Sequence, residues 1–181
     1  MENINFKNID KNAQKEITAL FASVFTESEG ESEGQLIRNL VLKLSSNIDN
    51  QEIICLSAYQ DELIIGSIFL TRLKVNKPID IYMLAPVAVS TRYQGKGIGQ
   101  ALINYGLKEL KNRDVAVAIT YGDPSFYSKV GFESLSEEII KAPLKMSMPE
   151  GWLGQSLTQK NIPFIGERPS CVKEFNDPVY W

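Results

Sequence analysis

The stretch YQGKGIGQAL, Tyr93 to Leu102, decides the interpretation of this chain, because glycine occupies three alternate positions with a lysine between two of them. Apolar residues at helical spacing follow it directly. The first N–H groups of a helix lack intrahelical partners and carry partial positive charge, so a glycine-rich entry into a helix is a ready anion site. Glycine also lets an anion approach the backbone and tolerates positive φ. We interpret the stretch as a cradle for a phosphate group, in preference to a plain tight turn.

The composition indicates one domain, because 181 residues with 44% hydrophobic residues suffice to bury one sizeable core. A net charge of −3 argues against nucleic acid as the main partner. The N-terminal residues lack the regions of a signal peptide, and no apolar run approaches the ~18 to 20 residues that span a bilayer. We therefore expect a cytoplasmic protein with no membrane partner, in which Cys55 and Cys171 are reduced thiols.

The chain contains no histidine. This excludes Ser-His-Asp and Cys-His mechanisms and every metal site that needs an imidazole ligand. The two cysteines have no CxxC or other metal-binding spacing, so we expect no metal. Any chemistry must use tyrosine, carboxylate, lysine, thiol or backbone groups.

Hydrophobic periodicity predicts two early helices, a hairpin and then alternating strands and helices. Asp10 is positioned to cap the first helix, and the acidic run TESEGESEG, Thr26 to Gly34, joins it to the second as an expected solvated segment. Four prolines and little periodicity in the last 33 residues predict loops. This order gives an α/β fold with a mixed sheet and helices on both faces. The expected strands are 4–6, 52–59, 62–70, 81–89, 115–121 and, in LKMSM, 144–148.

Two common phosphate-binding motifs do not fit the glycine stretch. A P-loop needs GxxxxGK followed by Ser or Thr, which is absent. The dinucleotide fingerprint GxGxxG needs glycine where Gln100 stands, and it normally lies near the start of its βαβ unit. A nicotinamide dehydrogenase is therefore disfavoured.

The pattern QxxGxG, Gln94 to Gly99, is matched completely, and GDPSFYSKVGFE follows at Gly122 to Glu133. With these two motifs in this order the chain resembles the GNAT superfamily of acetyl-CoA-dependent N-acetyltransferases, in particular a bacterial branch with a GDPxYY-like motif. The resemblance extends to about Met148. It implies a GNAT domain over 1–148, a C-terminal extension over 149–181 packed on it, and a central, mostly antiparallel sheet splayed between the fourth and fifth strands.

The resemblance also implies where acetyl-CoA, the cosubstrate, binds. The loop amides hold the pyrophosphate, and the strand before the loop aligns the pantetheine through its main chain, with Pro86 where that strand is interrupted. Phe126 fits aromatic packing better than a coenzyme contact, and Asp123 fits a helix cap, although it also has a place beside the coenzyme. The implied cofactor-binding residues are Val87, Ala88, Val89, Gln94, Gly95, Lys96, Gly97, Ile98, Gly99, Gln100, Asp123 and Phe126.

Tyr127 matches the family's general acid, which protonates the coenzyme sulfur as it leaves. A thiol pKa of ~8.5 and a tyrosine pKa of ~10 make this transfer only slightly uphill, so the acid helps without being indispensable. The alternative is an aromatic ring that only packs between strands. Main-chain N–H groups on the splayed strand are expected to stabilise the oxyanion.

The amine that accepts the acetyl group is not defined by the sequence; a small molecule and a peptide amine both remain open. One of Glu27, Glu29, Glu31 and Glu33 is a candidate to deprotonate it, against the plainer interpretation of a solvated charge run. Cys171 is a weak candidate nucleophile. The function indicated is direct acetyl transfer to a primary amine, and the alternative is a non-catalytic acyl-CoA-binding sensor with the same fold. A homodimer is left open.

Overall fold

In a computed structural model that describes residues 3–181, the chain forms two compact units. The first unit contains the residues up to Leu70 together with Pro86–Gly106, and the second contains Thr71–Ala85 and Leu107–Trp181. Strands β3 and β4 contribute residues to both units. Each unit is described below by itself.

The strands form one sheet in the order β1-β2-β3-β4-β5-β7-β6. The pair β4–β5 is parallel, whereas β1–β2, β5–β7 and β6–β7 are antiparallel, which confirms the predicted mixed sheet. The strands are β1 (Ile4–Ile9), β2 (Ile53–Gln60), β3 (Leu63–Leu73), β4 (Ile81–Val89), β5 (Val117–Tyr121), β6 (Glu133–Ser134) and β7 (Trp152–Ser156). The helices are α1 (Gln14–Glu29), α2 (Glu31–Ser46), α3 (Ile98–Asn112) and α4 (Pro124–Tyr127).

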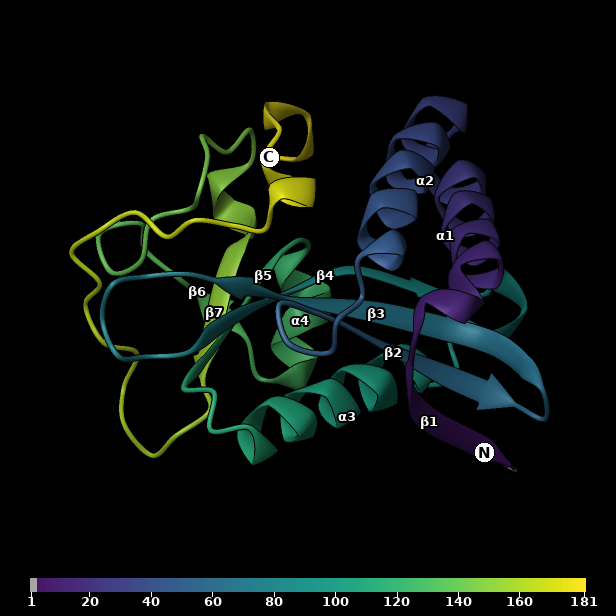
Figure 1. Ribbon diagram of the computed structural model, residues 1–181, viewed down its shortest axis with the longest axis horizontal. Helices are drawn as coiled ribbons and strands as arrows, with labels where there is room; N and C mark the ends of the chain where they lie inside the picture. The colour runs from purple at the N-terminus through teal and green to yellow at the C-terminus, as the bar shows by residue number, and fades with distance from the viewer. Residues whose placement is uncertain (1–2) are drawn as a thin grey trace. The chain divides into compact units, whose positions relative to one another are not determined.

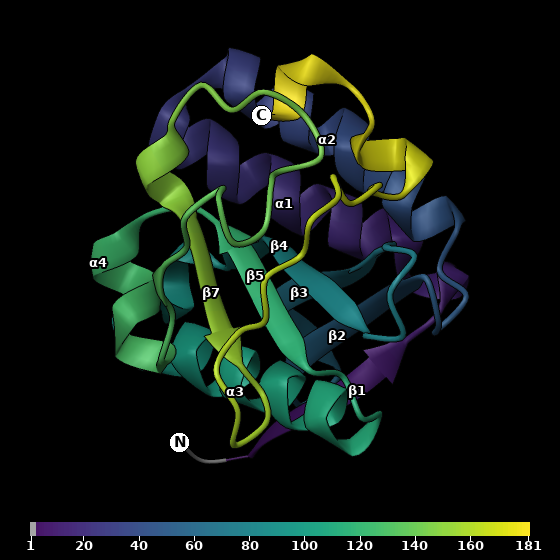
Figure 2. The same ribbon diagram turned by 90° about the vertical axis from the view of Figure 1, so that its left-hand side faces the viewer.

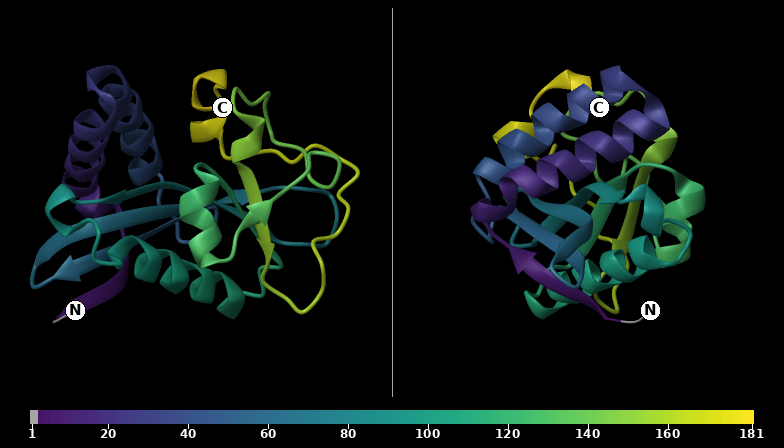
Figure 3. Two further views of the ribbon diagram at one scale, coloured as in Figure 1. Left: turned by 180° about the vertical axis from the view of Figure 1, so that it is seen from behind. Right: turned by 90° about the vertical axis from the view of Figure 1, so that its right-hand side faces the viewer.

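In the first unit, α1 and α2 lie side by side, and Gly30 alone separates them (Figures 1 and 3). The acidic residues of the joining run are exposed, as expected, but the run is helical on both sides of Gly30, and the expectation of a loop was wrong. Gly30 adopts a φ of 97°, which breaks the helix within one residue. Gly34 lets the helices meet, because a Cβ there would lie 1.8 Å from the Thr26 hydroxyl oxygen.

Helices cover both faces of the strands of the first unit. On one face the ring of Phe21 in α1 packs on Phe69 of β3, with 5.9 Å between the ring centroids. On the other face α3 approaches so closely that a Cβ on Gly106 would lie 2.8 Å from the Ile68 side chain. Ile68 and Phe69 are consecutive in β3, and successive side chains of a strand point to opposite faces. The hydrophobic run of β3 thus serves two helices.

In the second unit, β5 lies between β4 and β7 (Figure 2). The parallel pairing with β4 runs from Ile81–Val117 to Met83–Ile119 and stops short of the end of both strands. This is the place where the sequence resemblance predicts a separation of the fourth and fifth strands.

The strand expected over 144–148 does not form. At its end the Met148 N–H donates to the Tyr121 hydroxyl at 2.9 Å, and the Met148 carbonyl accepts from the Gly151 N–H. The strand that pairs with β5 is β7, inside the final segment that was predicted to contain only loops. The rest of that segment is anchored by aromatic rings, because Trp181 stacks on Tyr121 and also contacts Trp152.

Candidate functional site

The glycine loop has the backbone shape that an anion cradle needs. Gly95 and Gly97 have φ values of 73° and 78°, which side-chain-bearing residues rarely adopt. No atom lies within 4 Å of the position of a Cβ on either residue, so the backbone faces open space. The two glycines therefore leave the main chain accessible, as predicted from the sequence.

Helix α3 begins directly behind this loop. The Ala101 N–H donates to the Gly97 carbonyl at 3.0 Å, as in the first turn of a helix. Residues 98–100 come before Ala101 in the helix, so their N–H groups have no carbonyl acceptor within the helix. Ile98 is buried and anchors this turn. The end of a 15-residue helix, with its partial positive charge, thus adjoins the open glycine backbone.

Gln94 has a role within the loop itself. Its side-chain N–H donates to the Val89 carbonyl at 2.9 Å, which ties the loop to the end of β4. The Lys96 ammonium lies over the Tyr93 ring at 5.3 Å from the centroid, on the exposed part of the loop. Contacts of Gln94 and Lys96 with the coenzyme remain a prediction from the sequence.

The end of β4 approaches β3 closely in the first unit. Ala88 is buried, whereas Val87 and Val89 are half-buried. A Cβ on Gly66 would lie 3.3 Å from the Ala88 carbonyl oxygen, so a side chain at this position would crowd the approach of the two strands. Coenzyme contacts through the main chain of Val87–Val89 also stay a prediction.

Tyr127 is held on several sides in the second unit. Its side chain is buried, and its ring makes edge contacts with Phe126 and Phe132 at 5.1 and 5.7 Å between centroids. Burial raises the pKa of Tyr127 above its usual value of 10.0, a side-chain hydrogen bond with Thr120 opposes this, and the negative charge of Asp123 raises the pKa further. The phenol therefore keeps its proton at neutral pH, which an acid requires.

Asp123 caps the short helix that carries Tyr127. Its carboxylate accepts from the Ser125 N–H and from the Ser125 hydroxyl, both at 2.9 Å. The predicted capping role is confirmed, and a role beside the coenzyme stays a prediction. Phe126 is half-buried against Tyr127, which agrees with its packing interpretation.

Of the four candidate glutamates, Glu27 is engaged by its neighbours. Its carboxylate accepts hydrogen bonds from Thr91, just before the glycine loop, and from Ser23 at 3.3 Å. The exposed carboxylate thus links the end of α1 to the loop entrance. No local sequence pattern indicates this pairing, because the two partners are 64 residues apart.

Two residues near Tyr127 were missed from the sequence. Thr120 is a fully buried polar residue in the otherwise apolar run VAVAITY, and this contrast was the available signal. Gly122 lies against the Tyr127 ring, where a Cβ would come within 2.7 Å of Cε2. Both belong to the surroundings of the candidate acid.

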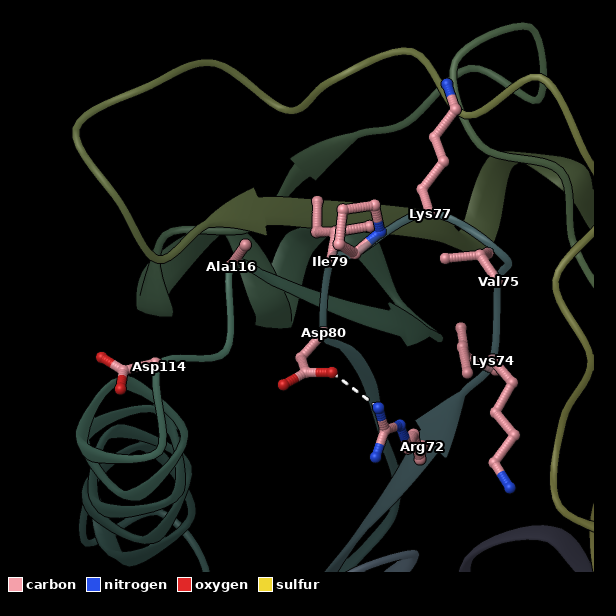
Figure 4. A pocket seen from close by; sticks show the side chains of 10 residues that line it. Arg72, Lys74, Val75, Lys77, Ile79, Asp80, Asp114 and Ala116 are labelled. Atoms are coloured by element: carbon pink, nitrogen blue, oxygen red, sulfur yellow. Dashed lines mark hydrogen bonds and ion pairs between the residues drawn. The ribbon is translucent and has the colours of Figure 1, made fainter.

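A hollow of about 270 Å³ in the second unit lies where β4 and β5 begin, with Asp80 and Ala116 among its lining residues (Figure 4). Arg72 donates to Asp80 at 2.7 Å across it, and the Lys74 and Lys77 ammonium groups point away from this pair. The positive groups of Arg72, Lys74 and Lys77 therefore do not converge on one point where an anion could bind. Over residues 3–181, no group of three or more Cys, Asp or Glu side chains is placed to hold a metal ion. No helix in this range has the length and apolar character needed to cross a membrane.

The strand order, the parallel β4–β5 pair and the open glycine turn before α3 are features of the GNAT fold. The sequence model of the acetyltransferase (GNAT) domain matches residues 26–147, and the chain belongs to this family.

Relatives and solved structures agree with this assignment. The uncharacterized N-acetyltransferase YhbS of Escherichia coli K12 is 42% identical over 50 residues, a match that spans 28% of this chain and only 30% of YhbS. The uncharacterized N-acetyltransferase YjhQ of the same strain is 28% identical over 71% of this chain and 74% of its own.

Two crystal structures share the fold over nearly the whole chain. The YhbS structure from Escherichia coli, in complex with CoA, has a TM-score of 0.78 at 22% identity and covers 97% of this chain and 93% of its own. A GNAT family acetyltransferase from Brucella melitensis, in complex with acetyl-CoA, has a TM-score of 0.70 at 19% identity and covers 97% and 100%. At these identities the likeness establishes the fold.

Proposed function

We propose that the protein transfers the acetyl group of acetyl-CoA directly to a primary amine. The observation that supports this most is the pair of open, positive-φ glycines, Gly95 and Gly97, ahead of the α3 N-terminus. Backbone N–H groups at such a helix end bind phosphate oxygens. The family assignment and the CoA and acetyl-CoA bound to the two similar structures support the same ligand.

In this proposal residues 95–100 bind the pyrophosphate through main-chain groups, and main-chain groups of Val87–Val89 align the pantetheine. The amine nitrogen attacks the thioester carbonyl carbon to form a tetrahedral intermediate, and the C–S bond then breaks with its electron pair on sulfur. Tyr127 gives its proton to the sulfur. The nitrogen releases one proton to solvent, and the phenolate takes one back from solvent, so the protons balance. Because burial raises the pKa of Tyr127, the proton transfer is more uphill than between unperturbed groups, so the acid has a moderate effect on the rate.

Calorimetry with acetyl-CoA tests binding, and coenzyme release tests turnover. The release assay would use a thiol reagent with n-butylamine, spermidine, a lysine-containing peptide and an aminoglycoside. Half-buried Cys171 will react with the reagent, so the protein is assayed as Cys171→Ser, whereas Cys55 is buried and protected. Binding without release for any acceptor would favour the acyl-CoA sensor instead.

Tyr127→Phe tests the acid, because it keeps the ring contacts with Phe126 and Phe132 and removes the proton. We expect acetyl-CoA affinity within a few fold of wild type and a kcat lower by about 10- to 10³-fold. The deficit should shrink with an acyl donor whose thiol has a lower pKa. A variant with full kcat would exclude the role and indicate that water protonates the sulfur.

A further inference from the structure

We propose that Glu27 is a positioning residue for the coenzyme: its carboxylate holds Thr91, and through Thr91 it keeps the glycine loop in the shape that receives the pyrophosphate. This inference rests on the proposed binding of acetyl-CoA at residues 95–100. It gives Glu27, a candidate base in the sequence, a different function. All the residues that carry the inference belong to the first unit.

The carboxylate of Glu27 uses each of its two oxygens for a different neighbour. Oε1 accepts from the hydroxyl of Ser23 at 3.3 Å, one turn earlier in α1, and Oε2 accepts from the hydroxyl of Thr91. The bond from Ser23 fixes how the carboxylate is turned, and the bond from Thr91 then fixes the loop entrance. Hydrogen bonds to an ionised carboxylate are stronger than those between neutral groups, so this pair can act at an exposed position.

Thr91 begins the turn that leads into the glycine loop. It is the first residue of a single 3₁₀ turn. The Tyr93 N–H donates to the Ser90 carbonyl at 2.7 Å. The Gln94 N–H donates to the Thr91 carbonyl at 3.4 Å, and Gly95 follows directly with its positive φ. Because the turn is closed by these bonds, a shift of Thr91 moves the first glycine of the loop with it.

The segment before the glycine loop has a main-chain tie to the sheet. The Ser90 N–H donates to the Ile65 carbonyl of β3 at 2.8 Å. A hollow of about 460 Å³ lies beside this tie, and its lining includes Glu27 of α1 and residues 90–92. Side-chain packing therefore does not fill the space between the helix and the segment, and the hydrogen bond from Thr91 to Glu27 spans it.

A loop that is already in its binding shape lowers the cost of binding the coenzyme. A flexible loop must be ordered when the ligand binds, so order that is present in the free protein raises the affinity. If the loop without the tether is in its binding shape for about a third to a tenth of the time, the affinity falls about three- to tenfold. The effect falls on acetyl-CoA binding and not on the chemical step that follows.

Thr91→Val and Thr91→Ser form the test pair, because valine keeps the branched shape without the hydroxyl and serine keeps the hydroxyl. We expect calorimetry to show an acetyl-CoA affinity about three- to tenfold lower for Thr91→Val and within about twofold of wild type for Thr91→Ser. In the release assay Thr91→Val should raise the KM for acetyl-CoA and leave kcat within about twofold of wild type. Equal affinities of the two variants would overturn the inference.

Glu27→Ala removes the other half of the tether and separates this role from that of a base. A tether predicts an affinity loss like that of Thr91→Val and no further loss when the two changes are combined. A base predicts a lower kcat at unchanged acetyl-CoA affinity. Such a kcat effect, or losses that add in the double variant, would contradict the tether.

Glu27→Gln is the matched control for charge. It removes the same negative charge as Glu27→Ala but keeps a side-chain oxygen that can accept from Thr91. Acetyl-CoA should therefore bind more tightly to Glu27→Gln than to Glu27→Ala. Equal binding would show that the charge, and not the hydrogen bond, affects the coenzyme, and the inference would fail.

A second readout needs no coenzyme. In the free protein the amides of Tyr93 and Gln94 donate the hydrogen bonds that close the turn. NMR should show that these amides lose most of their protection from hydrogen exchange in Thr91→Val and keep it in Thr91→Ser. Equal protection in the two variants would exclude a tether.

Failure of the tether and failure of the proposed coenzyme site give different results. If Gly97→Val binds acetyl-CoA as wild type does, the coenzyme does not lie on the glycine loop and the proposed site fails. If Gly97→Val binds weakly while Thr91→Val and Thr91→Ser do not differ, only the role of Glu27 fails.

Discussion

The ring of Tyr127 lies directly over the Cα of Gly122, so closely that a Cβ at this position would lie 2.7 Å from Cε2 and 3.4 Å from Cδ2 of the ring. Real Cβ atoms do not tolerate the shorter distance, and the atom that would have to move is part of a buried ring. Gly122 has no positive φ, so the backbone itself would accept alanine. Glycine is needed at this position because the Tyr127 ring occupies the space that a Cβ would fill.

Gly122→Ala should therefore displace the Tyr127 ring. We expect a loss of about 1–3 kcal/mol in the free energy of unfolding, as for other overpacked sites, and a lower kcat with little change in acetyl-CoA affinity. Urea unfolding and coenzyme release would measure the two effects. In a Tyr127→Leu background the stability cost of Gly122→Ala should largely disappear, and an undiminished cost there would show that the ring is not the cause.

Gly97→Val should weaken acetyl-CoA binding at least about tenfold, or roughly 1.4 kcal/mol, because a branched side chain would fill the open space before the α3 N-terminus. Gly30→Val is the matched control: Gly30 also has positive φ, at 97°, and no atom within 4 Å of its Cβ position. Both variants thus place valine at a positive φ, so the control shows how much of the loss comes from backbone strain. Calorimetry should show the affinity loss for Gly97→Val alone, and an equal loss in both would point to destabilisation instead.

The parts of this fold that sequence predicted well are local. The glycine loop, the apolar strand 81–89 and the cap at Asp123 follow from backbone preferences of neighbouring residues, and all three are present. The conformation of the acidic run was not predicted, because its charges suggested a solvated loop. One glycine was enough to end α1, and two amphipathic helices can keep charged residues on their outer faces.

The strand beside β5 shows what local patterns leave out. Residues 144–148 alternate as a strand should, but they form no strand, and the Met148 N–H donates to the Tyr121 hydroxyl. Trp152–Ser156 forms the strand β7 instead, because it pairs with β5 over its whole length. Strand pairing depends on residues that are distant in the sequence. The hydrogen bonds of Thr120 to Leu84 and of Thr91 to Glu27 also join distant residues, so no short stretch of sequence contains both partners.

Acetyl transfer should not depend on a metal ion. The chain has no histidine, and its described carboxylates and thiols form no cluster with the geometry of a metal site. Treatment with EDTA followed by gel filtration should leave coenzyme release unchanged. Loss of release that is restored by zinc or magnesium would contradict this prediction and require ligands that have not been identified.

The last prediction concerns Cys55, whose thiol packs in β2 beside the Ser67 hydroxyl at 3.3 Å. Burial raises the pKa of Cys55 from 9.0 to about 12, although the Ser67 hydrogen bond lowers it somewhat. Below pH 9 both the folded and the unfolded chain keep the proton, so this thiol adds no pH dependence. Between the two pKa values the unfolded chain loses the proton and the folded chain does not.

Stability should therefore fall as the pH rises above 9, and Cys55 should contribute up to about 1.4 kcal/mol per pH unit to this fall. Cys55→Ala removes that contribution, so its stability deficit relative to wild type should shrink between pH 9 and pH 11 in urea unfolding. Cys171→Ala is the comparison, because that thiol is only half-buried. If wild type and Cys55→Ala lose stability in parallel over this range, the buried thiol does not resist ionisation as the structure indicates.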